Sequence, residues 1–380
     1  MKLEINQELA QLRPSLRQFA TEKLEPLALE CDAIGAIPDA AWTVLRDHGY
    51  LGLRMPPEYG GAGVGIATYC LAMEEFGRSH RIFTAMLDYT SGLAPIGILT
   101  QGSQAQKAKY LRKLVDGTWR SAFALTEPGA GSDAQAISTR ADEGDGGWVL
   151  NGTKHYIGGA HKADVLMVVA VTDRALRGRG GITTFLVDKG APGMTVSRVD
   201  TTIGSAAMEV AELRFDDCRI PYDSVLGEVG KGFAIAMGSL VTGRMGIASS
   251  CLGAADRLIE MSVTHARQRK TFGQALAERQ AIQWMIADSV VELEQARAYV
   301  YETLRRLEAG EDVGTASSIC KLSCTEMAGR VADRAVQIHG GMGVIKGFPV
   351  ERFYRDLRHY RITEGSSEVQ RMLISRDALR

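Results

Sequence analysis

The spacing of hydrophobic positions changes twice along this chain. From the N-terminus to about residue 120, apolar side chains recur at helical spacing, as in the stripe Leu9, Leu12, Leu16, Phe19 and Leu24. This spacing predicts amphipathic helices. It becomes that of extended strands near residue 121, and the helical spacing returns near residue 231. We therefore expect three domains: a helical domain at 1–120, a β domain at 121–230 and a second helical domain at 231–380.

The middle region contains short apolar runs bounded by turn residues. We expect strands at 121–125, 148–157, 165–171, 182–187, 194–199 and 210–215. Asn151-Gly152 is a strong hairpin signal and predicts a turn between two strands. Because no helical segment separates these runs, they predict an antiparallel sheet or small barrel rather than a parallel doubly wound sheet.

The last region carries a long apolar seam at helical spacing. Its members are Ile282, Met285, Ile286, Leu293, Ala296, Val300, Leu304 and Leu307. A seam of this length is typical of a helical bundle. The expected fold class is therefore α+β, with an N-terminal helical domain, a middle antiparallel β domain and a C-terminal four-helix bundle.

Composition and charge exclude several functions. The chain has 44 lysines and arginines against 45 acidic residues, so no overall basic field favours nucleic acid or an anionic membrane. Six scattered cysteines and seven histidines show no metal-ligand spacing, which predicts free thiols and no metal. The N-terminal residues mix charges, and no apolar run reaches the roughly 18 residues of a membrane span. We expect a soluble, cytoplasmic protein.

Two glycine-rich stretches resemble nucleotide-binding loops only superficially. Residues 55–65 follow no clear strand and lack the GxGxxG spacing, so we interpret them as a turn-rich loop. Residues 227–232 lack the lysine–serine or lysine–threonine pair of a phosphate-binding loop. We interpret this second stretch as a linker.

One acidic residue near the C-terminus stands at an unusual position. Glu364 precedes Gly365, which lets the backbone turn sharply, and Ser366 is a candidate N-cap for a terminal helix. A carboxylate here would lie on a loop just outside the start of a helix. Taken alone, it is also explained as a solvated glutamate that complements the helix dipole.

Six motifs, in register along nearly the whole chain, together resemble the acyl-CoA dehydrogenase family. They are PPEYGG at 56–61, LTEPGAGSD at 125–133, NGTK at 151–154, RKTFG at 269–273, QIHGG at 337–341 and ITEG at 362–365. The resemblance implies FAD as cofactor, an acyl-CoA substrate and fatty acid metabolism. It also implies a homo-oligomer, commonly a homotetramer, and electron-transfer flavoprotein as the partner.

The resemblance also assigns site residues. Glu364 is the implied catalytic base, and Arg244, Gly365 and Ser132 are implied to contact the substrate. The implied FAD-binding residues are Phe123, Leu125, Thr126, Ser132, Tyr156, Gly158, Arg269, Thr271, Phe272, Gln280, Gln337, His339, Gly340, Gly341, Ser366 and Glu368.

Without the family, simpler interpretations stay open. The loop at Thr126 is explained as a plain turn, Tyr156 as a core aromatic, and Arg244 or Arg269 as ion-pairing or solvated arginines. Gly340-Gly341 would simply end a helix.

This chain departs from the family at some positions. Gly158 replaces a serine or threonine whose hydroxyl bonds the flavin in relatives, although a backbone N–H could substitute. Some relatives carry their base just before the arginine that matches Arg244, but Gly243 stands there, which leaves Glu364 as the candidate. Thr363 stands where many relatives have tyrosine.

The expected reaction is removal of the α-proton of an acyl thioester by Glu364 while the β-hydrogen leaves as hydride to flavin. Alternatives are a carrier-protein-bound acyl substrate, a flavin monooxygenase, the reverse enoyl-CoA reduction, and a DNA-binding relative. Near-zero net charge disfavours the DNA-binding alternative.

Overall fold

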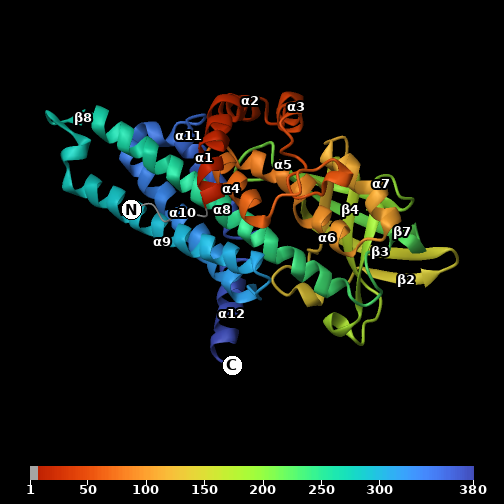
Figure 1. Ribbon diagram of the computed structural model, residues 1–380. Helices are drawn as coiled ribbons and strands as arrows, with labels where there is room; N and C mark the ends of the chain where they lie inside the picture. The colour runs from red at the N-terminus through yellow and green to blue at the C-terminus, as the bar shows by residue number, and fades with distance from the viewer. Residues whose placement is uncertain (1–6) are drawn as a thin grey trace.

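The computed structural model describes residues 7–380, so most of the charged N-terminal stretch lies outside it. Helices come first along the chain, a β-sheet follows, and a second group of helices ends it (Figure 1). This order of helices, sheet and helices agrees with the fold class predicted from the sequence.

The first helical region consists of short helices around an apolar core. A turn-rich loop separates α3 from α4, as predicted for residues 55–65. The helices are α1 (Gln7–Phe19), α2 (Glu25–Ile34), α3 (Asp39–Asp47), α4 (Ile66–Gly77), α5 (Arg81–Ser91), α6 (Leu93–Gln101) and α7 (Gln104–Val115).

The middle region forms a sheet in the order β1-β4-β2-β3-β7-β6, with β5 paired to β4. Its strands are β1 (Ser121–Ala124), β2 (Arg140–Gly144), β3 (Gly147–Gly158), β4 (Val165–Val171), β5 (Ile182–Asp188), β6 (Met194–Thr201) and β7 (Glu209–Pro221). The predicted antiparallel pairing holds for most neighbours, but β4 pairs in parallel with both β1 and β2. A parallel neighbour is possible for β1 because a long crossover, residues 125–164, separates it from β4.

The predicted hairpin at Asn151-Gly152 is wrong. The turn lies earlier, at Asp145-Gly146, where Gly146 has φ +83° and joins β2 to β3. Asn151 instead lies inside β3 at a register shift, where its amide donates to Asp217 Oδ1 at 3.1 Å and its Oδ1 accepts from the Asp217 N–H at 2.9 Å. An Asn-Gly sequence can therefore occur at a β-bulge, where Asn151 pairs with Asp217, as well as at a hairpin turn.

The C-terminal region is built from long helices. They are α8 (Gly232–Gln268), α9 (Gln280–Glu308), α10 (Gly314–His339), α11 (Pro349–Tyr360) and α12 (Ser367–Ala378), and a small hairpin of β8 (Lys270–Thr271) and β9 (Gln274–Ala275) joins α8 to α9. Figure 1 shows α8, α9 and α10 side by side, with α12 extending from their end. The segment 227–232 leads from the sheet region into α8, and at its end a Cβ on Gly232 would overlap the Thr183–Thr184 backbone of β5.

Helix α8 contacts all three regions. Segments Arg81–Gln101 and Gly232–Gln268 are long and apolar enough to cross a membrane, but both are mostly buried inside this fold. Gly253 of α8 lies against the backbone of α4, since an added Cβ would overlap the Glu74 carbonyl oxygen. Gly77 of α4 faces Ser250 in the same way. The glycines allow the two helices to approach closely.

We predict that Gly253→Ala lowers the free energy of unfolding by roughly 1–3 kcal/mol, because the new methyl group has no room against α4. Gly238→Ala, on the same helix, is the matched control: a Cβ there meets no described atom within 4 Å. The control should be neutral or stabilising by about 0.5–1 kcal/mol. Urea unfolding of both variants checks this, and equal stabilities would contradict the close approach of α4 and α8.

Candidate active site

The loop between α11 and α12 holds Glu364 in a strained backbone conformation. Glu364 has φ +54°, which costs a residue with a side chain about 1 kcal/mol or more. Two hydrogen bonds hold the neighbouring Gly365 carbonyl in place. Lys321 Nζ donates to its oxygen at 2.8 Å, and Gln370 Nε2 donates to it at 2.9 Å. Ser366 Oγ accepts from the Val369 N–H at 3.4 Å, which confirms the predicted N-cap of α12.

The Glu364 carboxylate is buried against α8. A Cβ on Gly243 would overlap its Oε2 atom and would lie 2.8 Å from the Leu93 side chain. Oε2 is shielded from solvent and has no hydrogen-bond partner among residues 7–380. Gly243 is therefore a structural requirement for this carboxylate, and an unpaired buried carboxylate oxygen is costly unless it serves a ligand.

The surroundings of Glu364 make it a stronger base. Burial and the negative charge of Asp88 raise the pKa of Glu364 to about 8, against the opposing effect of Arg244 and Lys321. Asp88 is buried as well, which raises its own pKa to about 6. A general base works best when its pKa lies near the working pH. Glu364 meets this requirement.

Arg244, on α8, lies beside the base as the resemblance implied. Its Nη1 donates to Ser318 Oγ at 3.4 Å, while its Nε has no partner in the described part of the chain. Burial lowers the pKa of Arg244, and the nearby Glu364 charge opposes that shift. Arg244, Gly365 and Glu364 thus form one cluster with free hydrogen-bonding capacity.

A second group of implied site residues gathers at the ends of β1 and β3. The His155 N–H donates to the Thr126 carbonyl at 2.8 Å and holds the loop after β1 against β3. The hydroxyls of Thr126 and Ser132 make no hydrogen bond within residues 7–380. Tyr156 has φ +57° and is 62% exposed, so the interpretation as a core aromatic is wrong. Phe123, Leu125 and Gly158 belong to the same strands and the adjoining loop.

Tyr89 of α5 is a neighbour of this group that sequence reasoning missed. A Cβ on Gly158 would lie 4.0 Å from the Tyr89 hydroxyl, and a Cβ on Gly159 would lie 3.0 Å from it. The hydroxyl has no hydrogen-bond partner in the described chain. The Tyr89 hydroxyl therefore lies close to Gly158 and is free to bind a ligand there.

The third group of implied residues is not brought to Glu364 within one chain. Arg269 and Thr271 lie at the far end of α8, roughly 37 Å from Arg244 by helical rise. Phe272, at φ +50°, is 98% exposed. Gln280 begins α9, and Gln337 to His339 end α10, with Gly340 and Gly341 in the following turn. Ser366 and Glu368 lie near the base, at the start of α12.

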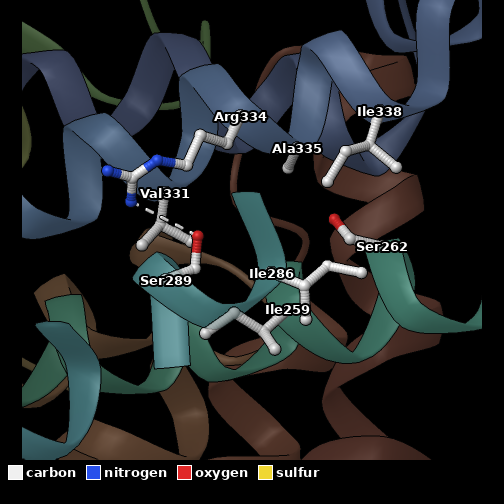
Figure 2. Close-up of a pocket in the computed structure, with 8 residues that line it drawn as sticks. All are labelled: Ile259, Ser262, Ile286, Ser289, Val331, Arg334, Ala335 and Ile338. Carbon is white, nitrogen blue, oxygen red and sulfur yellow. Dashed lines mark hydrogen bonds between the residues drawn. The ribbon is translucent and has the colours of Figure 1, made fainter. Parts of the chain in front are cut away.

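A small pocket between α8, α9 and α10 lies apart from Glu364 and from the β1–β3 group, at the end of α10 that carries Gln337 and His339 (Figure 2). Figure 2 shows mainly aliphatic walls, with Arg334 reaching Ser289 at 3.4 Å. Arg334 also donates to Glu292 Oε1 at 2.7 Å, so its charge is already paired. We interpret the pocket as a gap in helix packing.

The β1–β3 surface fits a flavin cofactor. It presents two unpartnered hydroxyls, an exposed tyrosine ring and the open glycines of the loop at 126–133. A Cβ added at Gly129 or Gly131 would meet no described atom within 4 Å. Such a surface of free donors without side-chain obstruction suits the polar edge and flat face of an isoalloxazine ring.

Fold and site define a flavin-dependent oxidoreductase. The chain belongs to the acyl-CoA dehydrogenase family: the models for its N-terminal, middle and C-terminal domains match residues 6–118, 122–218 and 230–379. FAD is the cofactor of this family, and solved structures of the fold with 27% identity and TM-scores of 0.94 contain it.

Similar proteins are named both as reductases and as dehydrogenases. The acryloyl-CoA reductase (NADH) of Anaerotignum propionicum is 38% identical over 382 residues, covering 100% of this chain and 96% of that protein. A subunit of the caffeyl-CoA reductase–Etf complex of Acetobacterium woodii is 36% identical, covering 96% of each. The structure of butyryl-CoA dehydrogenase from Megasphaera elsdenii superposes with a TM-score of 0.93 at 34% identity, covering 100% of both chains.

We predict that Glu364→Gln stabilises the protein increasingly as pH rises. A glutamate with an ordinary pKa of 4.5 that is raised to about 8 by folding costs nothing below pH 4.5. The cost grows as pH rises from 4.5 to about 8 and is constant above that. The variant should therefore exceed the wild type by about 2 kcal/mol at pH 9 and by little at pH 4.5. Urea unfolding in excess FAD measures the difference.

The surface variant Glu143→Gln is the control, because Glu143 is exposed on β2. Its difference from the wild type should not grow with pH as that of Glu364→Gln does. A gain for Glu364→Gln that is flat across this range would show that burial does not raise the pKa of Glu364.

Proposed function

We propose that this chain is an FAD-dependent acyl-CoA dehydrogenase that desaturates an acyl-CoA thioester to the trans-2-enoyl product, with Glu364 as the base. One observation carries the proposal: the Glu364 carboxylate is buried, has an oxygen without a partner among the described residues, and is held in a strained loop. A purely structural glutamate would gain nothing from this arrangement.

The chain's own groups supply the proton chemistry. Glu364 removes the proton from the carbon next to the thioester carbonyl, and Gly365 leaves room for the substrate to approach. The backbone N–H of Glu364 donates to no acceptor in residues 7–380, so it is free to hydrogen-bond the thioester oxygen. That bond stabilises the negative charge that develops as the proton leaves. Bound FAD supplies the acceptor for the hydride from the next carbon.

We propose that Thr126, Ser132 and Tyr156 hold the flavin, and that Ser132 also lies near the acyl-CoA. The residues at the far end of α8 and α10 then serve a neighbouring subunit. Their distance from Glu364 and the exposed Phe272 support a homo-oligomer, which the resemblance suggests is a tetramer. Electron-transfer flavoprotein is the proposed redox partner, in line with the Etf complex of one relative. The proposed location is the cytoplasm.

The reverse reaction, reduction of an enoyl-CoA, is a second candidate. It is favoured by the similarity to an acryloyl-CoA reductase along the whole chain. The same residues serve it, because Glu364 then donates the proton that it would otherwise remove. Comparing flavin reduction by acyl-CoA with flavin reoxidation by enoyl-CoA distinguishes the physiological direction.

We predict that Glu364→Gln lowers the rate of flavin bleaching by acyl-CoA about 10²–10⁴-fold, since this is the usual contribution of a general base. Stopped-flow absorbance of the FAD-loaded protein without oxygen measures the rate. Glu143→Gln should bleach as the wild type does. Unchanged bleaching by Glu364→Gln with full FAD content would overturn the assignment of the base.

A further inference from the structure

Arg54 carries a guanidinium whose donors are free. It lies in the loop between α3 and α4, and its side chain makes no hydrogen bond to residues 7–380. Its Nη1 atom is nevertheless shielded from solvent. Its described neighbour is the Tyr69 ring, 5.4 Å from the guanidinium carbon. Shielded donors without acceptors are costly, so they point to a ligand that supplies an acceptor.

Asp88 provides an acceptor close to Arg54, but the two do not pair. The charges of Arg54 and Asp88 interact, yet no ion pair joins them in the described structure. Asp88 instead accepts the Leu93 N–H at 3.2 Å, and its carboxylate fills the space beside Gly92, where a Cβ would overlap it. A donor and an acceptor are thus fixed near each other without satisfying each other.

These groups lie next to the proposed base. Asp88 Oδ1 accepts the Leu93 N–H at 3.2 Å, and the Leu93 side chain lies beside the same Gly243 position that Glu364 Oε2 contacts. Helix α8 shows how close Tyr69 lies to the base. Gly243 lies against Glu364. One turn later along the helix, the Cβ position of Gly246 lies 3.8 Å from the Tyr69 ring. The hydroxyl of Tyr69, like the Arg54 guanidinium, has no hydrogen-bond partner within residues 7–380. Polar groups therefore extend from the base beside the apolar side chains of Leu93 and Met73.

Charge decides which ligand group fits. A carboxylate would be repelled by Asp88 and Glu364, and an ammonium group would be repelled by Arg54. An alkyl chain would leave the Arg54 donors unpaired. A hydroxyl is neutral, accepts from Arg54 and donates to Asp88 at the same time.

We propose that Arg54, Tyr69 and Asp88 form a polar subsite that binds a hydroxyl group on the acyl part of the substrate. The proposal rests on the proposed function, because it takes Glu364 to mark where the acyl thioester lies. It narrows the substrate class from acyl-CoA in general to hydroxylated acyl-CoA. A site built to hydrogen-bond a hydroxyl rejects an analogue that lacks it.

Two pairs of probes that differ only in a hydroxyl test the subsite: 4-hydroxybutyryl-CoA against butyryl-CoA, and 3-(4-hydroxyphenyl)propionyl-CoA against 3-phenylpropionyl-CoA. Anaerobic flavin reduction gives kcat and KM for each, and calorimetry gives Kd for the matching enoyl-CoA products. In at least one pair, the wild type should prefer the hydroxylated compound tenfold or more in both kcat/KM and Kd.

Variants link that preference to the two charged residues. Arg54→Met and Asp88→Asn should each bring the preference to about one while the protein keeps its FAD. Arg46→Met, an exposed arginine on α3, is the matched control and should keep the wild-type preference. If Arg54→Met fails to fold, Asp88→Asn alone decides whether the preference depends on this subsite.

The outcomes separate the two proposals. Flavin reduction by none of the four compounds would count against the proposed function itself. Flavin reduction with a preference for the hydroxylated compound below tenfold in both pairs would leave the function standing and overturn the subsite. A preference that survives both variants would also overturn it.

Discussion

The contact between the Glu364 carboxylate and Gly243 of α8 is the constraint on which the rest of this site depends. It requires a missing side chain on α8, a left-handed backbone at Glu364, and positive charge from Arg244 and Lys321 to limit the cost of burial. These conditions come from α8, from the loop before α12 and from α10. No single segment creates the base, because α8 supplies Gly243 and Arg244, the loop supplies the left-handed backbone, and α10 supplies Lys321.

Helix α8 meets this constraint with a face of small residues. Gly243, Gly246 and Gly253 follow one another at spacings that keep them on one side of the helix. Gly243 admits the base, Gly246 lies beside Tyr69 and Met73, and Gly253 admits the α4 backbone. Glycine inside a helix costs roughly 0.5–1 kcal/mol per residue relative to alanine. The fold offsets this cost by bringing α4 and the active-site loop close to the same helix.

Features that depend on neighbouring residues were predictable from the sequence. The order of helical and β regions follows from the spacing of apolar side chains, and the N-cap at Ser366 follows from its type and position. Strand β2 was missed because its residues, Arg140–Gly144, are mainly polar and bury only Ala141 well. Asn151-Gly152 was misread because a bulge inside β3 uses the same residues as a turn.

The candidate site was only partly predictable, for a related reason. Glu364 and Gly365 stand in the motif at 362–365, and the family resemblance also implied Arg244, so these residues could be named before any coordinates. Asp88 and Tyr89 belong to no such motif. They reach the site because α5, near the N-terminus, packs beside elements from the middle and the end of the chain. Contacts between residues so far apart in the chain produce no periodic pattern in the amino-acid sequence, so they could not be predicted from it.

Asp88 connects base strength with substrate choice. Two nearby carboxylates in a buried site repel each other, so ionisation of one opposes ionisation of the other and the pair titrates as a unit. With pKa values of about 6 and about 8, the pair shares close to one proton at neutral pH. Any group that hydrogen-bonds Asp88 changes this sharing. A substrate hydroxyl that engages Asp88 therefore acts on the proton affinity of Glu364, so recognition and proton transfer depend on the same carboxylate.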